Sequence, residues 1–255
     1  MVWLRAWRRR KLKARTFPAA WQELLWKRSL LYRHLPAMDR EELHGHIRVF
    51  VTEKRFEGAG GLLVTDEVRV LVASQACLLL LHRSADYFPG LYSIVIYPSG
   101  YLAPKRERDQ VGAVVEAVEA RAGETWARGT LVLAWDAVLA GAAGRAGCSN
   151  VVIHEFAHQL DYQTGEADGA PLLPRDRYPE WSRVWGREYA RLQRALARGL
   201  PVDISPYGAK NPAEFFAVVV EQFFMCPRAL SSRHPGLYRQ LQELFRQDPA
   251  SWLPR

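Results

Sequence analysis

His154, Glu155 and His158 form the motif in this sequence whose side chains could do chemistry together. On a helix, His154 and His158 stand one turn apart, so both imidazoles can reach one ion at the ~2.0–2.1 Å of a Zn–N bond. Glu155 follows the first histidine and projects beside the ion, where its carboxylate can take a proton from an attacking water. The spacing therefore predicts a catalytic zinc site on a helix.

The residues around this motif favour the metal site over a chance match. Most of them are apolar, which is typical of a buried helix, and buried ionisable groups are costly without partners. A metal ion would supply such a partner. The alternative is an ordinary helix whose histidines satisfy hydrogen bonds in the core. The apolar residues are Val151, Val152, Ile153, Phe156, Ala157 and Leu160.

A catalytic zinc site needs a third protein ligand, and its position distinguishes the peptidase classes. Asp161 and Thr164 stand where the extended metzincin motif requires glycine and then histidine or aspartate, so that class is excluded. Asp161 lies one turn after His158 and is better placed to orient a ligand histidine than to bind the ion. Glu214 and Glu221 are seven residues apart in a second apolar helical stretch, on roughly one face, and we expect one of them to face the metal.

Glu214 also has a structural interpretation. With Asn211 as N-cap and Pro212 at the first helical position, Glu214 falls where a capping-box carboxylate belongs. The local pattern leaves cap and ligand equally open. Glu221 could likewise orient a ligand or be a charge at the edge of the core.

Three segments carry a resemblance to a known family. They are residues 56–65, 150–161 and 207–218. In these segments the chain resembles the Mlc titration factor A family of bacterial zinc-dependent peptidases. The similarity extends over roughly residues 18–245, and the last two segments are its specific parts.

The resemblance implies a catalytic core similar to that of anthrax lethal factor. It implies His154, His158 and Glu214 as zinc ligands and Glu155 as catalytic base. It also implies that Tyr207, seven residues before Glu214, points into the site. The partners implied are a peptide or protein substrate and a sugar-uptake transcriptional repressor.

Composition and periodicity predict a mainly helical α+β fold with a small sheet beside the zinc helix, and the resemblance implies that this fold is zincin-like. We expect a basic extension over residues 1–17 and a peptidase domain over 18–255, which could divide into a helical lobe (18–90) and a catalytic lobe (91–255). The 255 residues are 49 % apolar, enough for a substantial core. The predicted helices cover residues 18–34, 39–54, 66–82, 178–199, 212–226 and 234–246.

Two apolar runs, residues 92–97 and 129–135, are expected to form strands. The second precedes the zinc helix, so residues 130–135 are the candidate edge strand for pairing with an extended peptide. An internal strand is the equally open alternative.

The net charge of +8 is concentrated at one end of the chain. Residues 1–33 hold ten Lys and Arg against one acid, Glu23, whereas the rest holds 25 against 26. Nucleic acid is therefore not the expected partner of the body. The basic, tryptophan-rich end is expected to be solvated and partly disordered, although it could touch anionic lipid, nucleic acid or an acidic partner.

The three cysteines are odd in number and widely spaced, which favours reduced thiols in a cytoplasmic protein. They are Cys77, Cys148 and Cys226. We expect no signal peptide and no transmembrane segment, because the longest apolar run, residues 70–81, is too short. Oligomeric state is not indicated by the sequence.

Overall fold

The structure of the protein is a computed structural model. The structure describes the backbone of residues 2–84, 86–108, 114–121, 123–126 and 129–253. It describes the side chains of residues 3–84, 86–100 and 129–253. Within these residues, no helix is long and apolar enough to cross a membrane.

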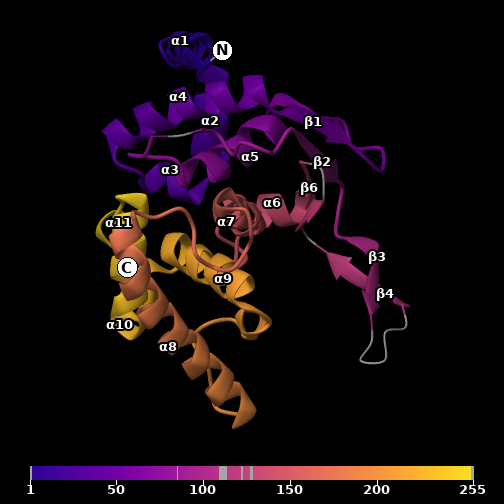
Figure 1. Ribbon diagram of the computed structural model, residues 1–255. Helices are drawn as coiled ribbons and strands as arrows, with labels where there is room; N and C mark the ends of the chain where they lie inside the picture. Colours follow the sequence, from indigo (N-terminus) through magenta and orange to yellow (C-terminus); the bar gives the residue numbers. More distant parts are fainter. Residues whose placement is uncertain (1, 85, 109–113, 122, 127–128, 254–255) are drawn as a thin grey trace.

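The N-terminal part is helical, as predicted (Figure 1). Its helices are α1 (Val2–Lys13), α2 (Ala19–Arg28), α3 (Leu30–His34), α4 (Ala37–Glu53) and α5 (Asp66–Leu78). The single helix expected over residues 18–34 is broken at Ser29, whose hydroxyl accepts a hydrogen bond from the Tyr32 N–H and caps α3.

Helix α1 corrects the expectation of a partly disordered N-terminal end. The Arg9 guanidinium donates to both carboxylate oxygens of Glu53, each at 2.8 Å, and to Asp86 at 2.8 Å. Arg48 of α4 donates to the carbonyl of Leu12 at 3.2 Å, which satisfies the C-terminal end of α1. Residues 2–13 therefore form a helix that is bound to α4 and Asp86 by hydrogen bonds and ion pairs.

A four-stranded sheet lies beside these helices in the order β1-β2-β6-β5. Strands β1 (Arg55–Gly58), β2 (Ser93–Tyr97) and β6 (Thr130–Ala134) are parallel, and β5 (Gly123–Trp126) is antiparallel to β6. A separate antiparallel pair consists of β3 (Tyr101–Arg108) and β4 (Val114–Arg121).

The sheet order corrects the candidate peptide-binding strand. Because β6 pairs with β2 on one side and β5 on the other, residues 130–134 are internal and have no open edge. The edge strand beside α7 (Val151–Asp161) is β5.

The C-terminal part is helical and repeatedly uses proline at the start of a helix, where the missing N–H costs nothing. Its α-helices are α6 (Trp135–Ala142), α7, α8 (Tyr178–Ala197), α9 (Pro212–Met225), α10 (Pro227–Arg233), α11 (Pro235–Phe245) and α12 (Pro249–Trp252). Figure 1 shows α7 between the N-terminal helices and α9.

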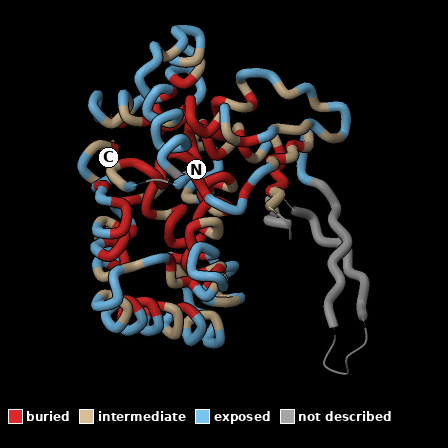
Figure 2. Tube along the Cα trace, turned by 45° about the horizontal axis from the view of Figure 1, so that its top comes forward, coloured by how far each residue is buried: buried red, intermediate tan, exposed pale blue. Residues whose placement is uncertain are grey.

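One hydrophobic core connects the two halves of the chain. Phe156 of α7 meets Phe50 of α4 at 5.6 Å and Phe88 at 4.7 Å between ring centroids. Figure 2 shows buried segments running through both halves. The core therefore fixes α7 from its apolar side and leaves its histidine face toward α9. The division into two lobes stays a prediction.

Candidate metal centre

Helix α7 presents the two histidines from one face. Asn150 caps the helix by accepting a hydrogen bond from the Ile153 N–H at 3.1 Å. One turn separates His154 from His158, and their ring centroids lie 4.9 Å apart. The predicted helical spacing is thus confirmed.

Helix α9 brings Glu214 to these histidines. Its Oε2 lies 3.1 Å from Nε2 of His154 and 3.3 Å from Nε2 of His158. The ligand atoms of the three residues all lie within 4.8 Å of one another. Asn211 caps α9 by accepting from the Glu214 N–H at 2.8 Å, so the Glu214 backbone belongs to the cap while its carboxylate faces the histidines.

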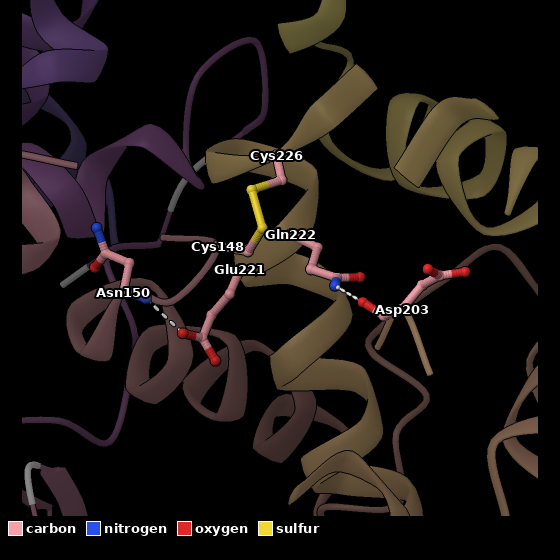
Figure 3. Close-up of a disulfide and its surroundings, with 6 residues drawn as sticks. All are labelled: Cys148, Asn150, Asp203, Glu221, Gln222 and Cys226. Atoms are coloured by element: carbon pink, nitrogen blue, oxygen red, sulfur yellow. Dashed lines mark hydrogen bonds between the residues drawn. A yellow bond between two sulfur atoms is a disulfide. The ribbon is translucent and has the colours of Figure 1, made fainter. Parts of the chain in front are cut away.

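Glu221, two turns later on α9, contacts the ring nitrogen of His154 that Glu214 does not contact. Its Oε1 lies 2.7 Å from Nδ1 of His154, and its Oε2 accepts from the Asn150 N–H at 2.5 Å (Figure 3). Because Glu221 engages Nδ1, Nε2 of His154 is turned toward Glu214 and His158. This is the arrangement in which a carboxylate orients a metal-binding imidazole.

The carboxylates make the cluster strongly attractive to positive charge. Burial lowers the pKa of His154, but hydrogen bonds with Glu214 and Glu221 outweigh it and raise that pKa to about 10. Burial opposes ionisation of Glu214 too, yet the two histidines hold its pKa well below the ordinary range. Two imidazoles and one carboxylate around a common point are a donor set that fits zinc with one position left open.

Two further predicted residues lie at this cluster. Glu155 is buried, and its charge contributes to the raised pKa of His154. Tyr207 lies in a short 3-10 turn (Pro206–Ala209) before α9. Its hydroxyl donates to Oε1 of Glu214 at 3.3 Å, and its ring centroid lies 6.0 Å from that of His154.

Asp161 does not take the orienting position that the sequence suggested. Its Oδ2 accepts from the Gly169 N–H at 2.8 Å and so ties down the loop after α7. Burial, which outweighs this bond, raises the pKa of Asp161 to about 6. Glu221 rather than Asp161 contacts a histidine of the cluster.

A disulfide between Cys148 and Cys226 corrects the prediction of three free thiols. Cys148 lies two residues before the cap of α7 and Cys226 directly follows α9, so the bridge joins the two helices that carry the cluster (Figure 3). The wide spacing and odd count of cysteines gave no signal of this pairing. Cys77 is free and buried.

Comparisons with known proteins show the family of this chain. The family model of the glucose-regulated metallo-peptidase M90 matches residues 4–246. A protein of Synechocystis named slr2042, described as uncharacterized, is 38 % identical over 95 % of this chain and 89 % of its own length.

Proteins named Mlc titration factor A are also similar. The one from Pectobacterium atrosepticum is 32 % identical over 80 % of this chain and 77 % of its own length. The one from Klebsiella pneumoniae subsp. pneumoniae is 29 % identical over 89 % of this chain and 87 % of its own length. These matches confirm the resemblance found in the sequence, and the chain belongs to the glucose-regulated metallo-peptidase M90 family.

Proposed function

We propose that the chain is a zinc peptidase that binds one zinc ion through His154, His158 and Glu214. The observation that carries the proposal is the convergence of their three ligand atoms within 4.8 Å, beside the buried Glu155. The family supplies a metallopeptidase context but no residue roles.

The proposed mechanism assigns proton transfer and hydrogen bonding to two residues. Zinc, when bound, supplies a Lewis acid that polarises the scissile carbonyl and lowers the pKa of water. Glu155 takes the proton of the attacking water and delivers it to the leaving amine. The Tyr207 hydroxyl, next to Glu214, donates a hydrogen bond to the carbonyl oxygen as negative charge develops there.

Glu155→Gln tests the assignment of the base. The amide keeps the shape of the side chain and loses its basicity, so we expect one zinc per chain in both proteins and loss of peptide hydrolysis in the variant. Elemental analysis and turnover of a mixed peptide library measure the two properties. A His154→Ala, His158→Ala double variant serves as the metal-free control. Undiminished hydrolysis by zinc-loaded Glu155→Gln would place the base elsewhere.

The name of the relatives supports a second proposal. We propose that the chain also binds a transcriptional repressor of the Mlc type, which would place it in the cytoplasm. Such binding needs a surface rather than a metal. Size-exclusion chromatography of the chain mixed with a purified Mlc repressor should show a complex that the His154→Ala, His158→Ala variant also forms. Separate elution of both proteins at micromolar concentrations would contradict the proposal.

A further inference from the structure

Helix α1 exposes three large apolar side chains along one side. Trp3, Leu4 and Trp7 are 77 %, 63 % and 44 % exposed. At helical spacing, Trp7 lies one turn after both Trp3 and Leu4, so the three side chains form one surface. Large aromatic residues rarely gather on an open surface without a partner.

The opposite face of α1 is the one that binds the body. Arg9 pairs with Glu53 and Asp86, and Leu12 is buried. Arg5, one turn before Arg9, lies 3.7 Å and 3.6 Å from the same two carboxylates. These contacts fix the rotation of the helix, so the tryptophans are held outward. Figure 1 shows α1 on the outside of the molecule, beyond α4.

Basic side chains border the exposed apolar face. Arg8, Arg10 and Lys11 are exposed, and no acidic side chain among the described residues pairs with them at ion-pair distance. The Lys11 ammonium lies 4.5 Å from the centre of the Trp7 ring. Cationic and aromatic groups therefore share one surface, whereas residues 34–255 are nearly neutral.

We propose that α1 docks the protein on an anionic lipid surface, with Trp3, Leu4 and Trp7 in the interfacial layer and Arg8, Arg10 and Lys11 against the headgroups. The combination fits the interface because tryptophan rings settle at headgroup level and long basic side chains reach phosphate from a partly buried stem. The helix lies on the membrane and does not span it. This inference does not depend on the proposed peptidase activity.

The apolar residues favour lipid over nucleic acid or an acidic protein. Phosphate backbones and acidic surfaces would be bound by the cations alone, and their binding would fall steeply with salt. The side chain of Leu4 in particular has no charge or hydrogen-bond donor with which to bind a polyanion. A membrane uses both parts of the surface, because the cations attract the protein and the apolar groups then leave water.

Flotation with lipid vesicles tests the proposal on the full chain. Vesicles of equal parts phosphatidylglycerol and phosphatidylcholine should bind the protein, and phosphatidylcholine vesicles should not. The double variant Trp3→Ser, Trp7→Ser should weaken binding by at least roughly tenfold, because it removes the free energy gained when each ring moves from water into the membrane. Trp26→Ser on α2, which removes a ring that is 51 % exposed, is the matched control and should bind like the parent.

A charge variant tests the second part of the surface. The triple change Arg8→Glu, Arg10→Glu, Lys11→Glu should weaken binding by at least about 100-fold, because each cation near an anionic membrane contributes roughly fivefold. The matched control, Arg194→Glu, Arg198→Glu, Arg239→Glu, gives the same net charge from exposed positions on other elements. It should retain most of the binding.

Three outcomes would overturn the proposal. These are equal binding to neutral vesicles, unchanged binding of the tryptophan variant, or equal losses in the two charge variants. Binding to a DNA duplex that needs the cations but not the tryptophans, without vesicle binding, would instead assign α1 to nucleic acid. Circular dichroism of each variant checks that helix content is retained.

Discussion

Glu214 and Glu221 lie on one face of α9 but contact different atoms. Glu214 reaches Nε2 of both histidines, whereas Glu221 reaches Nδ1 of His154 and the backbone of Asn150. The first position suits a metal ligand and the second suits an orienting partner. The two carboxylates should therefore respond differently to mutation.

We predict that Glu214→Ala abolishes tight zinc binding, whereas Glu221→Gln weakens it by about 10–100-fold. Competition with a chromogenic chelator measures both affinities. Because Asn211 supplies the cap of α9, the metal-free Glu214→Ala variant should keep the helix content of the metal-free parent, which circular dichroism measures. A zinc affinity that survives Glu214→Ala and collapses in Glu221→Gln would reverse the two roles.

We predict that Tyr207→Phe lowers kcat by about 10²–10³ with little change in zinc content or KM. The aromatic ring remains to pack, and only the hydroxyl that contacts Glu214 is lost. Steady-state kinetics on the zinc-loaded variant measure the effect. A larger KM at unchanged kcat would make Tyr207 a substrate-binding residue, and parental kinetics would remove it from the mechanism.

At the scale of elements, two neighbouring contacts join the N-terminal end of α7 to α9. The Asn150 N–H binds Glu221, and the Cys148–Cys226 disulfide lies beside this contact. The bridge closes a long loop, since its cysteines are 78 residues apart, and it should stabilise the fold mainly by restricting the unfolded chain.

We predict that Cys148→Ser with Cys226→Ser lowers the free energy of unfolding by about 2–4 kcal/mol while zinc stays bound, because Glu221 still holds His154. Urea denaturation measures the loss. Reductant should bring the parent to the same stability and leave the variant unchanged. Alkylation of denatured, unreduced protein should modify Cys77 alone, and three modified cysteines would show that the bridge does not form.

Local patterns predicted the elements better than their partners. The helices over α4, α5, α8, α9 and α11 and the strands β2 and β6 were found within a few residues, because periodicity and caps are local signals. Helix α7 and the one-turn spacing of its two histidines were predicted for the same reason. The mainly helical α+β class is confirmed, and so is the placement of a small sheet beside α7.

Distant pairings account for what the sequence did not predict. Arg9 orders α1 through Glu53 and Asp86, which are 44 and 77 residues away. The position of β6 inside the sheet depends on β5, a strand of four residues that periodicity did not reveal. Local pattern also left Glu214 between cap and ligand, because its backbone and its carboxylate take part in different contacts.

At the scale of the whole molecule, a buried polar cluster links α4 to the segment that follows α5. His46 of α4 is fully buried, with Nδ1 2.8 Å from the Tyr87 hydroxyl and Nε2 3.2 Å from Glu42. Burial, assisted by the charge of Lys13, outweighs the attraction of Glu42 and lowers the pKa of His46 to about 4. Neutral His46 accepts from Tyr87 and donates to Glu42, so both ring nitrogens are satisfied.

We predict that this histidine makes the fold sensitive to mild acid. Because the pKa is about 4 when folded and 6.5 when unfolded, the unfolded chain binds more protons between these values. The contribution of neutral His46 to the free energy of unfolding is complete above pH 6.5. It is lost as the pH falls toward 4, by up to roughly 3 kcal/mol.

The variant His46→Gln tests this prediction, because glutamine keeps a donor toward Glu42 and cannot titrate. Urea denaturation of chelator-treated parent and variant at pH 4.5–7.5 should give a shallower decline in stability for the variant, whatever its absolute stability. His154 and His158 contribute equally to both proteins. Parallel curves would mean that His46 does not carry the acid sensitivity.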